Sequence, residues 1–110
     1  MRIVSFLILL LSLGVSHAAE QIWLDVRTPQ EFSEGHVESA INIPFDQIAG
    51  RISEVTDDKD SEILLYCRSG RRAEMAMATL QELGYHSIRN LQTLDAANQY
   101  FKEQTRKEKQ

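Results

Sequence analysis

Short apolar runs alternate with longer amphipathic segments along most of this chain. The apolar runs are rich in strand-forming residues and predict strands over 21–26, 41–44, 62–66 and 86–91. The first run is apolar throughout, which favours a buried strand over one that faces solvent on one side. Strands that alternate with helices predict an α/β fold, with a small, mainly parallel sheet flanked by helices.

The first two helices are marked by their end residues and by their apolar spacing. Thr28 is placed to be an N-cap, Pro29 suits the first helical position, and Glu31 completes a capping box. Gly35 is placed to end this short helix. A second helix is predicted over 46–55, because its apolar residues recur at helical spacing on one stripe: Ile48, Ile52 and Val55.

The remaining helices follow the third and fourth strands. We predict a helix over 73–83 that stops at Gly84 and packs these residues into the core: Met75, Ala76, Thr79, Leu80 and Leu83. A closing helix is expected over 95–101, after which the highly charged tail from about 102 is expected to fray. The polar run 56–61 predicts a loop whose charges are solvated.

The N-terminal segment has the pattern of an export signal. A positively charged start is followed by an apolar core and a small-x-small cleavage site that ends at Ala18. The apolar core is shorter than the ~20 residues that are needed to cross a bilayer. We therefore expect a signal peptide over 1–18, cleaved after Ala18 or Ala19, and a single exported domain over 19–110, with the periplasm as its compartment.

Charge and cysteine content limit the partners of this domain. The chain holds 16 acidic against 12 basic residues, which argues against nucleic acid or an anionic membrane as the main partner. One cysteine cannot form an internal disulfide, so in an exported protein it is either paired between chains or kept for chemistry. We expect a monomer with no stable membrane association after signal cleavage.

The candidate chemistry lies in the loop that follows the strand over 62–66. Cys67 is followed there by Arg68-Ser69-Gly70-Arg71-Arg72. A strand-to-helix loop gathers backbone N–H groups and the positive end of the helix dipole, which together with arginines favour a thiolate over a thiol. Ligands of open parallel sheets bind outside the carboxyl ends of the strands, where Cys67 stands. We favour a nucleophile over the competing interpretation, a buried core cysteine beside solvated arginines.

Two separated motifs resemble those of a known family. The first comprises Asp25-Val26-Arg27, Glu31-Phe32, Gly35-His36-Val37 and Ala40-Ile41-Asn42-Ile43-Pro44; the second is the loop from Cys67 to Arg72, and Gly84-Tyr85 follows later. In this order they resemble a single-domain rhodanese, a sulfurtransferase, and in particular the exported phage shock protein E type of that family. The resemblance covers 23–90 and implies a rhodanese-like α/β fold.

The resemblance also implies a two-step covalent reaction that needs no cofactor. Cys67 would take sulfane sulfur from a small anionic donor such as thiosulfate, hold it as a persulfide, and pass it to a thiophilic acceptor, cyanide or a thiol. The loop backbone, with Ser69 and Gly70, would stabilise the anions. Arg71 and Arg68 are candidates to hold the donor's oxyanion.

Other charged residues of the motifs have less direct roles. Arg72 is a further candidate for the donor anion, although on the first helical turn it is equally placed to point to solvent. We interpret Asp25, Arg27 and His36 as structural support, in which Asp25 and Arg27 pair with one another and His36 bonds backbone. No cluster of histidine, cysteine and acidic residues has metal-ligand spacing, so we predict no metal.

One departure from the family pattern and two other functions remain open. Rhodaneses often carry a Gly-Gly pair after the last strand, where 91–94 reads Leu-Gln-Thr-Leu; these bulkier residues are expected to narrow the pocket and affect substrate choice. A cysteine-dependent phosphatase is disfavoured, because its arginine would fall at Ala73 and Arg72 arrives one residue early. A persulfide carrier that serves a partner protein would use the same Cys67, and the loop residues do not separate it from an enzyme.

Overall fold

The sheet of this protein is fully parallel. The computed structural model describes residues 20–109, so the expected signal peptide over 1–18 lies outside the described residues. The strands are β1 (Gln21–Asp25), β2 (Ile41–Asn42), β3 (Glu62–Cys67) and β4 (Ser87–Thr93). They form a single four-stranded sheet in the order β2-β1-β3-β4, which confirms the predicted α/β fold.

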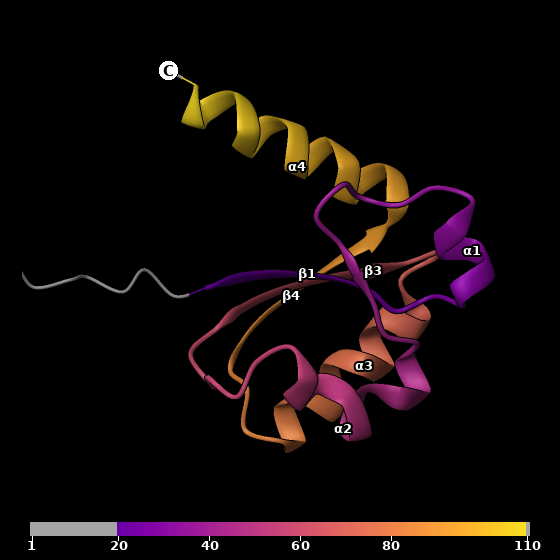
Figure 1. Ribbon diagram of the computed structural model, residues 1–110, viewed down its shortest axis with the longest axis vertical. Helices are drawn as coiled ribbons and strands as arrows, with labels where there is room; N and C mark the ends of the chain where they lie inside the picture. The colour runs from indigo at the N-terminus through magenta and orange to yellow at the C-terminus, as the bar shows by residue number, and fades with distance from the viewer. Residues whose placement is uncertain (1–19, 110) are drawn as a thin grey trace, which may run out of the picture.

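Helices cover both faces of this sheet. The helices α2 (Ile48–Arg51) and α3 (Arg71–Glu82) lie on one face and α4 (Leu94–Glu108) lies on the other (Figure 1). Successive residues of β3 enter the two cores in turn, Leu65 on the α3 side and Leu64 on the α4 side. Burial on both faces explains why the central strand is apolar throughout.

The short helix α1 (Pro29–Ser33) has the ends that its sequence predicts. The hydroxyl oxygen of Thr28 accepts the N–H of Glu31 at 3.2 Å, and Oε1 of Glu31 accepts the N–H of Thr28 at 3.2 Å. The C-cap residue is Glu34, and Gly35 follows it with a φ of 147°. The capping box therefore fixes α1 directly after the carboxyl end of β1.

Residues 45–54 form consecutive short turns rather than one helix over 46–55. A 3-10 turn (Phe45–Gln47), α2 and a second 3-10 turn (Ile52–Glu54) follow one another. Ile48 and Ile52 are buried, so the apolar stripe was predicted correctly and the regular helix was not. Gly50 lies in the middle of the segment, and a glycine costs a helix roughly 1 kcal/mol relative to alanine.

Helix α3 starts earlier than predicted and buries a narrower face. The side chains of Met75 and Leu83 are 51% and 37% exposed, so the prediction that they lie in the core was wrong. The buried stripe consists of Ala73, Ala76 and Leu80. Two alanines in this stripe let the helix lie close to the sheet, which leaves the larger side chains on its flanks. Gly84, with a φ of 98°, ends the helix as predicted.

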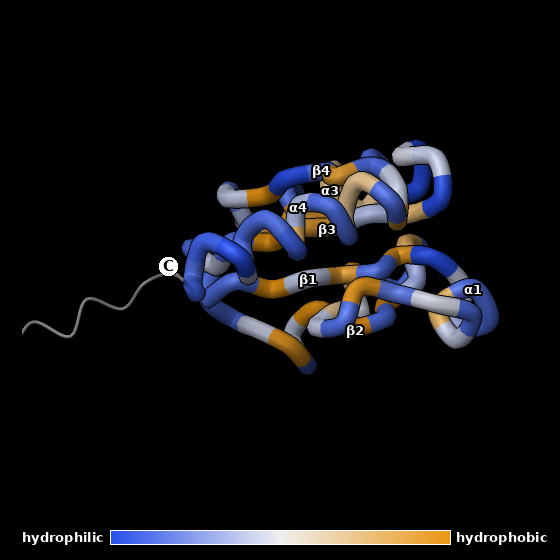
Figure 2. The backbone as a smooth tube through the Cα atoms, turned by 90° about the horizontal axis from the view of Figure 1, so that it is seen from above, coloured by the Kyte–Doolittle hydropathy of each residue, from blue (hydrophilic) through white to orange (hydrophobic). Residues whose placement is uncertain are grey.

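Helix α4 is longer than predicted, and the tail over 102–108 is helical rather than frayed. Its start is capped by Thr93, whose hydroxyl oxygen accepts the N–H of Ala96 at 3.1 Å. Most of α4 is hydrophilic (Figure 2), but lysine, glutamate and glutamine are good helix formers, and Arg106 and Lys107 suit the C-terminal end of the helix dipole. Like every other helix within residues 20–109, α4 is not apolar and long enough to cross a membrane.

The loop over 56–61 is only partly solvated. Its charged residues are exposed, as predicted, but Thr56 and Ser61 are buried and their hydroxyl groups are 2.9 Å apart. The hydroxyl of Tyr85 donates to the carbonyl of Thr56 at 2.7 Å. Both ends of the loop are therefore fixed to the core.

Candidate active site

Cys67 is the last residue of β3 and lies at the carboxyl end of the sheet. Its side chain is fully buried and belongs to the apolar core between the sheet and α3. Its Sγ accepts two backbone hydrogen bonds, from the N–H of Gly70 at 2.9 Å and from the N–H of Ala73 at 3.4 Å. The burial is that of an ordinary core cysteine, whereas the two donors are the partners that an anionic sulfur takes. Both interpretations of the cysteine therefore describe part of its environment.

The loop that brings these donors to the sulfur is short. Only Arg68, Ser69 and Gly70 separate β3 from α3. The sequence predicted N–H donors from the loop that ends at Arg72, and the donor of Ala73 lies one residue beyond it. Gly70 is the N-cap of α3 and adopts a φ of 96°, which residues with a side chain rarely adopt. The N-cap residue Gly70 has no side chain that could cap this helix, and the sulfur of Cys67 accepts an N–H of its first turn instead.

The arginines of the loop differ in their surroundings. Arg68 and Arg71 are exposed and form no ion pair with the residues that the structure describes. Arg72 forms a bidentate ion pair with Glu31, with Nη1 to Oε1 at 2.7 Å and Nη2 to Oε2 at 3.0 Å. Arg72 therefore neither points to solvent nor offers a free guanidinium to a donor anion, in contrast to what the sequence suggested.

Glu31 connects the two sequence motifs. The hydrogen bonds from Arg72 are the main cause that lowers the pKa of Glu31 to about 2, and the same bonds raise the pKa of Arg72. The carboxylate also completes the capping box with Thr28, so it holds α1 and the first turn of α3 together. The sequence predicts only the capping role of Glu31, because its partner Arg72 lies 41 residues away and no local spacing indicates the pair.

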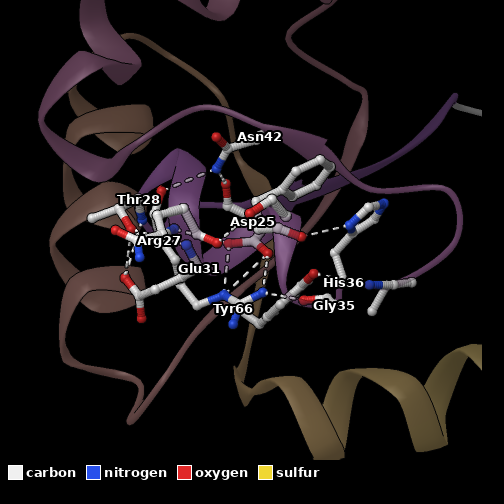
Figure 3. Close-up of polar contacts among 12 residues, drawn as sticks. Asp25, Arg27, Thr28, Glu31, Gly35, His36, Asn42 and Tyr66 are labelled. Atoms are coloured by element: carbon white, nitrogen blue, oxygen red, sulfur yellow. Dashed lines mark hydrogen bonds and ion pairs between the residues drawn. The ribbon is translucent and has the colours of Figure 1, made fainter.

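Asp25 and Arg27 pair with one another at the end of β1, as predicted (Figure 3). Nη2 of Arg27 lies 2.6 Å from Oδ2 of Asp25, and Nε donates to both carboxylate oxygens at 3.0 and 3.1 Å. Nη2 also donates to the carbonyl of Gly35 at 2.7 Å, which fastens the loop after α1. The hydrogen bonds to the buried carboxylate of Asp25 raise the pKa of Arg27.

His36 and Tyr66 also hold backbone groups of the first motif (Figure 3). The Nδ1 atom of His36 lies 2.8 Å from the carbonyl oxygen of Phe32, and the exposed imidazole stacks on the Phe32 ring with 3.6 Å between centroids. The hydroxyl oxygen of Tyr66 accepts the N–H of Val37 at 3.0 Å, and burial raises the pKa of this hydroxyl. Sequence analysis missed Tyr66, although a tyrosine in a buried strand usually needs such a partner.

A hollow of about 450 Å³ opens at this end of the sheet. Its lining is Arg27, Glu31, Glu34, Arg68, Thr93, Leu94 and Asp95. Thr93 pairs with the buried Cys67 in the sheet, so the hollow adjoins the strand ends that carry the cysteine, although Cys67 itself does not line it. A larger hollow of about 610 Å³ shares none of these residues and lies against the β1 and β2 edge of the sheet. Among residues 20–109, no group of three histidine, cysteine or acidic side chains is arranged to hold a metal ion.

The segment 91–94 reaches the smaller hollow through Thr93 and Leu94, which line it. Gln92 has a φ of 74° and is the one non-glycine residue between 20 and 109 with a positive φ. A Cβ atom placed on Gly70 would lie 3.2 Å from the Cβ of Gln92, so this residue closes tightly over the loop. The effect of these bulkier residues on substrate choice stays a prediction.

Comparison with known proteins decides the family of this site. The family model of the Rhodanese-like domain matches residues 13–93. The chain belongs to the rhodanese family. Among similar proteins, Thiosulfate sulfurtransferase PspE of Escherichia coli (strain K12) is 40% identical to this rhodanese over 72 residues, which cover 66% of this chain and 69% of that protein.

Two further comparisons agree with this family. A protein named Sulfurtransferase from Allochromatium vinosum is 36% identical over 81 residues, which cover 74% of each chain. The solved structure "rhodanese with anions from E. coli" superposes with a TM-score of 0.66 at 36% identity and covers 69% of this chain and 89% of that chain. The family and fold that the two motifs implied are thereby confirmed.

Proposed function

We propose that this rhodanese is a thiosulfate sulfurtransferase that passes sulfane sulfur to a thiophilic acceptor, cyanide or a thiol, through a persulfide on Cys67. The observation that carries the proposal is the position of Sγ, which accepts the N–H groups of Gly70 and Ala73 at the N-terminus of α3. Membership of the family and the names of the relatives support sulfur transfer in general.

The reaction consists of two displacements at sulfur. In the first, the thiolate of Cys67 attacks the outer sulfur of thiosulfate, the S–S bond of the donor breaks, and sulfite leaves with the electron pair. In the second, the acceptor attacks the outer sulfur of the persulfide, the new S–S bond breaks, and the thiolate of Cys67 returns. No net oxidation of the protein occurs, and a covalent intermediate of this kind gives ping-pong kinetics.

The loop supplies donors for both anions. The N–H groups of Gly70 and Ala73 hold the sulfur of Cys67, and those of Arg71 and Arg72 take no hydrogen-bond partner among residues 20–109. We assign these free donors, with the backbone of Ser69, to the outer sulfur and to the departing sulfite. The exposed guanidinium groups of Arg71 and Arg68 are assigned to the sulfonate oxygens of the donor, because a planar fork suits an oxyanion.

Three other residues are assigned supporting roles. Asp25 and Arg27 hold the loop after α1 through the carbonyl of Gly35, and His36 bonds the backbone of α1. A thiolate needs no general base, so neither step of the reaction requires the imidazole of His36.

We also propose that the chain is exported to the periplasm after cleavage of residues 1–18, which the mass of the mature protein tests.

A persulfide carrier is the second candidate function. Its support is a relative named "Putative sulfur carrier protein YrkF" from Bacillus subtilis, which is 34% identical over 68 residues, although these cover only 36% of that protein. A carrier would form the same persulfide on Cys67 and release it to one partner protein. Trapping of a specific protein through Cys67, with slow turnover on cyanide and small thiols, would favour this function.

The enzyme assay follows thiocyanate formation from thiosulfate and cyanide. We expect saturation by both substrates, parallel double-reciprocal lines, and no turnover by Cys67→Ser. Intersecting lines would exclude the persulfide mechanism, because a covalent intermediate separates the two substrates in time. Turnover that survives Cys67→Ser would exclude Cys67 as the nucleophile.

A further inference from the structure

The last strand contacts the active-site loop through an irregularity. Leu65 pairs with Asn90, whereas the next residue of β3, Tyr66, pairs with Gln92. Leu91 is therefore an extra residue in β4, and the strand is bulged immediately before it reaches the mouth of the hollow. Bulges next to active sites re-aim neighbouring side chains. Asn90 directly precedes the extra residue Leu91, so its side chain lies at the bulge.

The carboxamide of Asn90 uses both of its ends. Its Nδ2 donates to the carbonyl of Gly70 at 3.1 Å, and its Oδ1 accepts the N–H of Gln92 at 2.8 Å. This assignment of nitrogen and oxygen is fixed by its partners, because the reverse orientation would face N–H with N–H and oxygen with oxygen. Asn90 therefore joins the bulge of β4 to the loop that follows Cys67.

Both the carbonyl and the N–H of Gly70 are held by hydrogen bonds. Its carbonyl accepts from Asn90 and from the N–H of Glu74 at 2.9 Å, and its N–H donates to Sγ of Cys67 at 2.9 Å. Gly70 has a φ of 96° and no side chain to restrict its torsions. The N–H and the C=O of a residue turn about the same Cα atom, so a fixed carbonyl limits the arc through which the N–H moves.

We propose that Asn90 is a positioning residue for the anionic sulfur of Cys67 and acts by fixing the carbonyl of Gly70. The proposal rests on the proposed function in that it takes Cys67 as the nucleophile. Asn90 itself makes no hydrogen bond to the sulfur, and within residues 20–109 its side chain bonds only the two backbone groups named above. A carboxamide is required at this site, because a carboxylate keeps the acceptor for Gln92 and loses the donor for Gly70.

The chain offers a matched control on the neighbouring strand. Asn42 is half-buried like Asn90, and its Nδ2 donates to the carbonyls of Asp25 and Arg27, both at 3.0 Å. Its side chain makes no hydrogen bond to the loop 67–73. Asn42→Ala therefore removes two carboxamide hydrogen bonds to the backbone without changing the donors on the sulfur.

The test measures how alkylation of Cys67 by iodoacetamide depends on pH, together with the melting temperature. We expect Asn90→Ala to move the alkylation midpoint to higher pH and to slow persulfide loading from thiosulfate about tenfold, the effect of weakening a hydrogen bond to an anion. Asn90→Asp should move the midpoint further, because its carboxylate also adds a negative charge near the sulfur. Asn42→Ala should lower the melting temperature comparably and leave the alkylation midpoint in place. Asn90→Asp retains the bond to Gln92, so it provides a folded variant if Asn90→Ala does not fold.

An unchanged midpoint in both Asn90 variants, with a melting temperature lowered as in Asn42→Ala, would overturn the positioning role. A failure of the proposed function would give a different result. The wild-type protein would gain no sulfur from thiosulfate, whereas the alkylation midpoint would still differ between the wild type and the Asn90 variants. A shift of the midpoint in Asn42→Ala as well would also contradict the proposal, since it would show that any loss of backbone support changes the sulfur.

Discussion

The two strand-to-helix junctions at the carboxyl end of the sheet differ in how they satisfy the free N–H groups at the start of their helices. After β1, the free N–H groups of α1 are satisfied by side chains, with Thr28 and Glu31 in a reciprocal capping box. After β3, the N-cap of the longer helix α3 is a glycine, and the sulfur of Cys67 accepts an N–H of the first turn. At the first junction the N–H groups are capped by polar side chains, whereas at the second the N–H groups of Gly70 and Ala73 donate to the sulfur of Cys67, where the helix dipole favours negative charge.

We infer from this difference that the sulfur chemistry belongs to the second junction and that the first supports it. Both junctions lie on adjacent parallel strands and both are tied to the same carboxylate, since Glu31 caps α1 and pairs with Arg72 of α3. The first junction therefore serves as a rigid support against which the second is held. Substitutions at the two junctions should separate stability from sulfur chemistry.

The largest contrast is expected between the two capping residues. Cys67→Ser should lower turnover by about a thousandfold or more, because it removes the nucleophile. Thr28→Ala should cost about 1 kcal/mol of stability through the lost N-cap and leave kcat within about twofold. Steady-state kinetics and chemical denaturation of both variants check this contrast, and a large loss of kcat in Thr28→Ala would break it.

The two glycines give the next contrast. Gly70→Ala should destabilise the fold by about 1–2 kcal/mol, through its positive φ and its contact with Gln92, and should lower turnover roughly tenfold or more by displacing the donor to the sulfur. Gly35 also has a positive φ but nothing lies near its Cβ position. Gly35→Ala should therefore lose stability and keep most of its turnover. Equal losses of turnover at both glycines would contradict the special role of the second junction.

A smaller effect is expected from the exposed arginine of the second junction. Arg71→Ala should raise the KM for thiosulfate about tenfold with little change in kcat, if the guanidinium binds ground state and transition state equally. Arg51, an arginine of α2 that pairs with Glu54 and lines the larger hollow at the β1 and β2 edge, provides a control outside the loop of Cys67. Unchanged kinetics in Arg71→Ala would remove Arg71 from the donor site.

The smallest effect concerns the carboxylate shared by both junctions. The folded-state pKa of Glu31 is lowered from an ordinary value of 4.5 to about 2, so its pairing stabilises the protein above about pH 4.5 and is lost as the pH falls toward 2. Glu31→Gln should therefore cost about 1 kcal/mol near neutral pH, a modest figure because the pair is partly exposed. Unfolding curves at several pH values check that this difference shrinks between pH 4.5 and 2; a constant difference would contradict the pairing.

The first junction and the sheet could be predicted from the sequence because their signals are local. The capping box spans four residues, and the strands are short apolar runs. The pairs that join the two junctions, Glu31 with Arg72 and Asn90 with Gly70, depend on how distant segments meet. No periodicity indicates them. The tail over 102–108 was mispredicted because high charge was taken as a sign of fraying, although its residues favour a helix.

The position of Cys67 in the candidate site could be predicted from the sequence, but its surroundings could be predicted only in part. The sequence placed Cys67 at the carboxyl end of a central strand, where the structure has it. Its complete burial and the donor of Ala73 follow from the short loop and the early start of α3, which no residue pattern marked. The role of Gln92 was also hidden, because a glutamine with a positive φ leaves no local signal.

The most direct test is the intact mass of the purified, reduced protein before and after thiosulfate, with cyanide added last. We predict a gain of about one sulfur atom (~32 Da) that is confined to Cys67, removed by cyanide, and absent in Cys67→Ser, as covalent catalysis requires. Folded, reduced protein that gains no mass from thiosulfate would contradict thiosulfate as the donor. A sulfur adduct that persists in Cys67→Ser would contradict the assignment of the nucleophile.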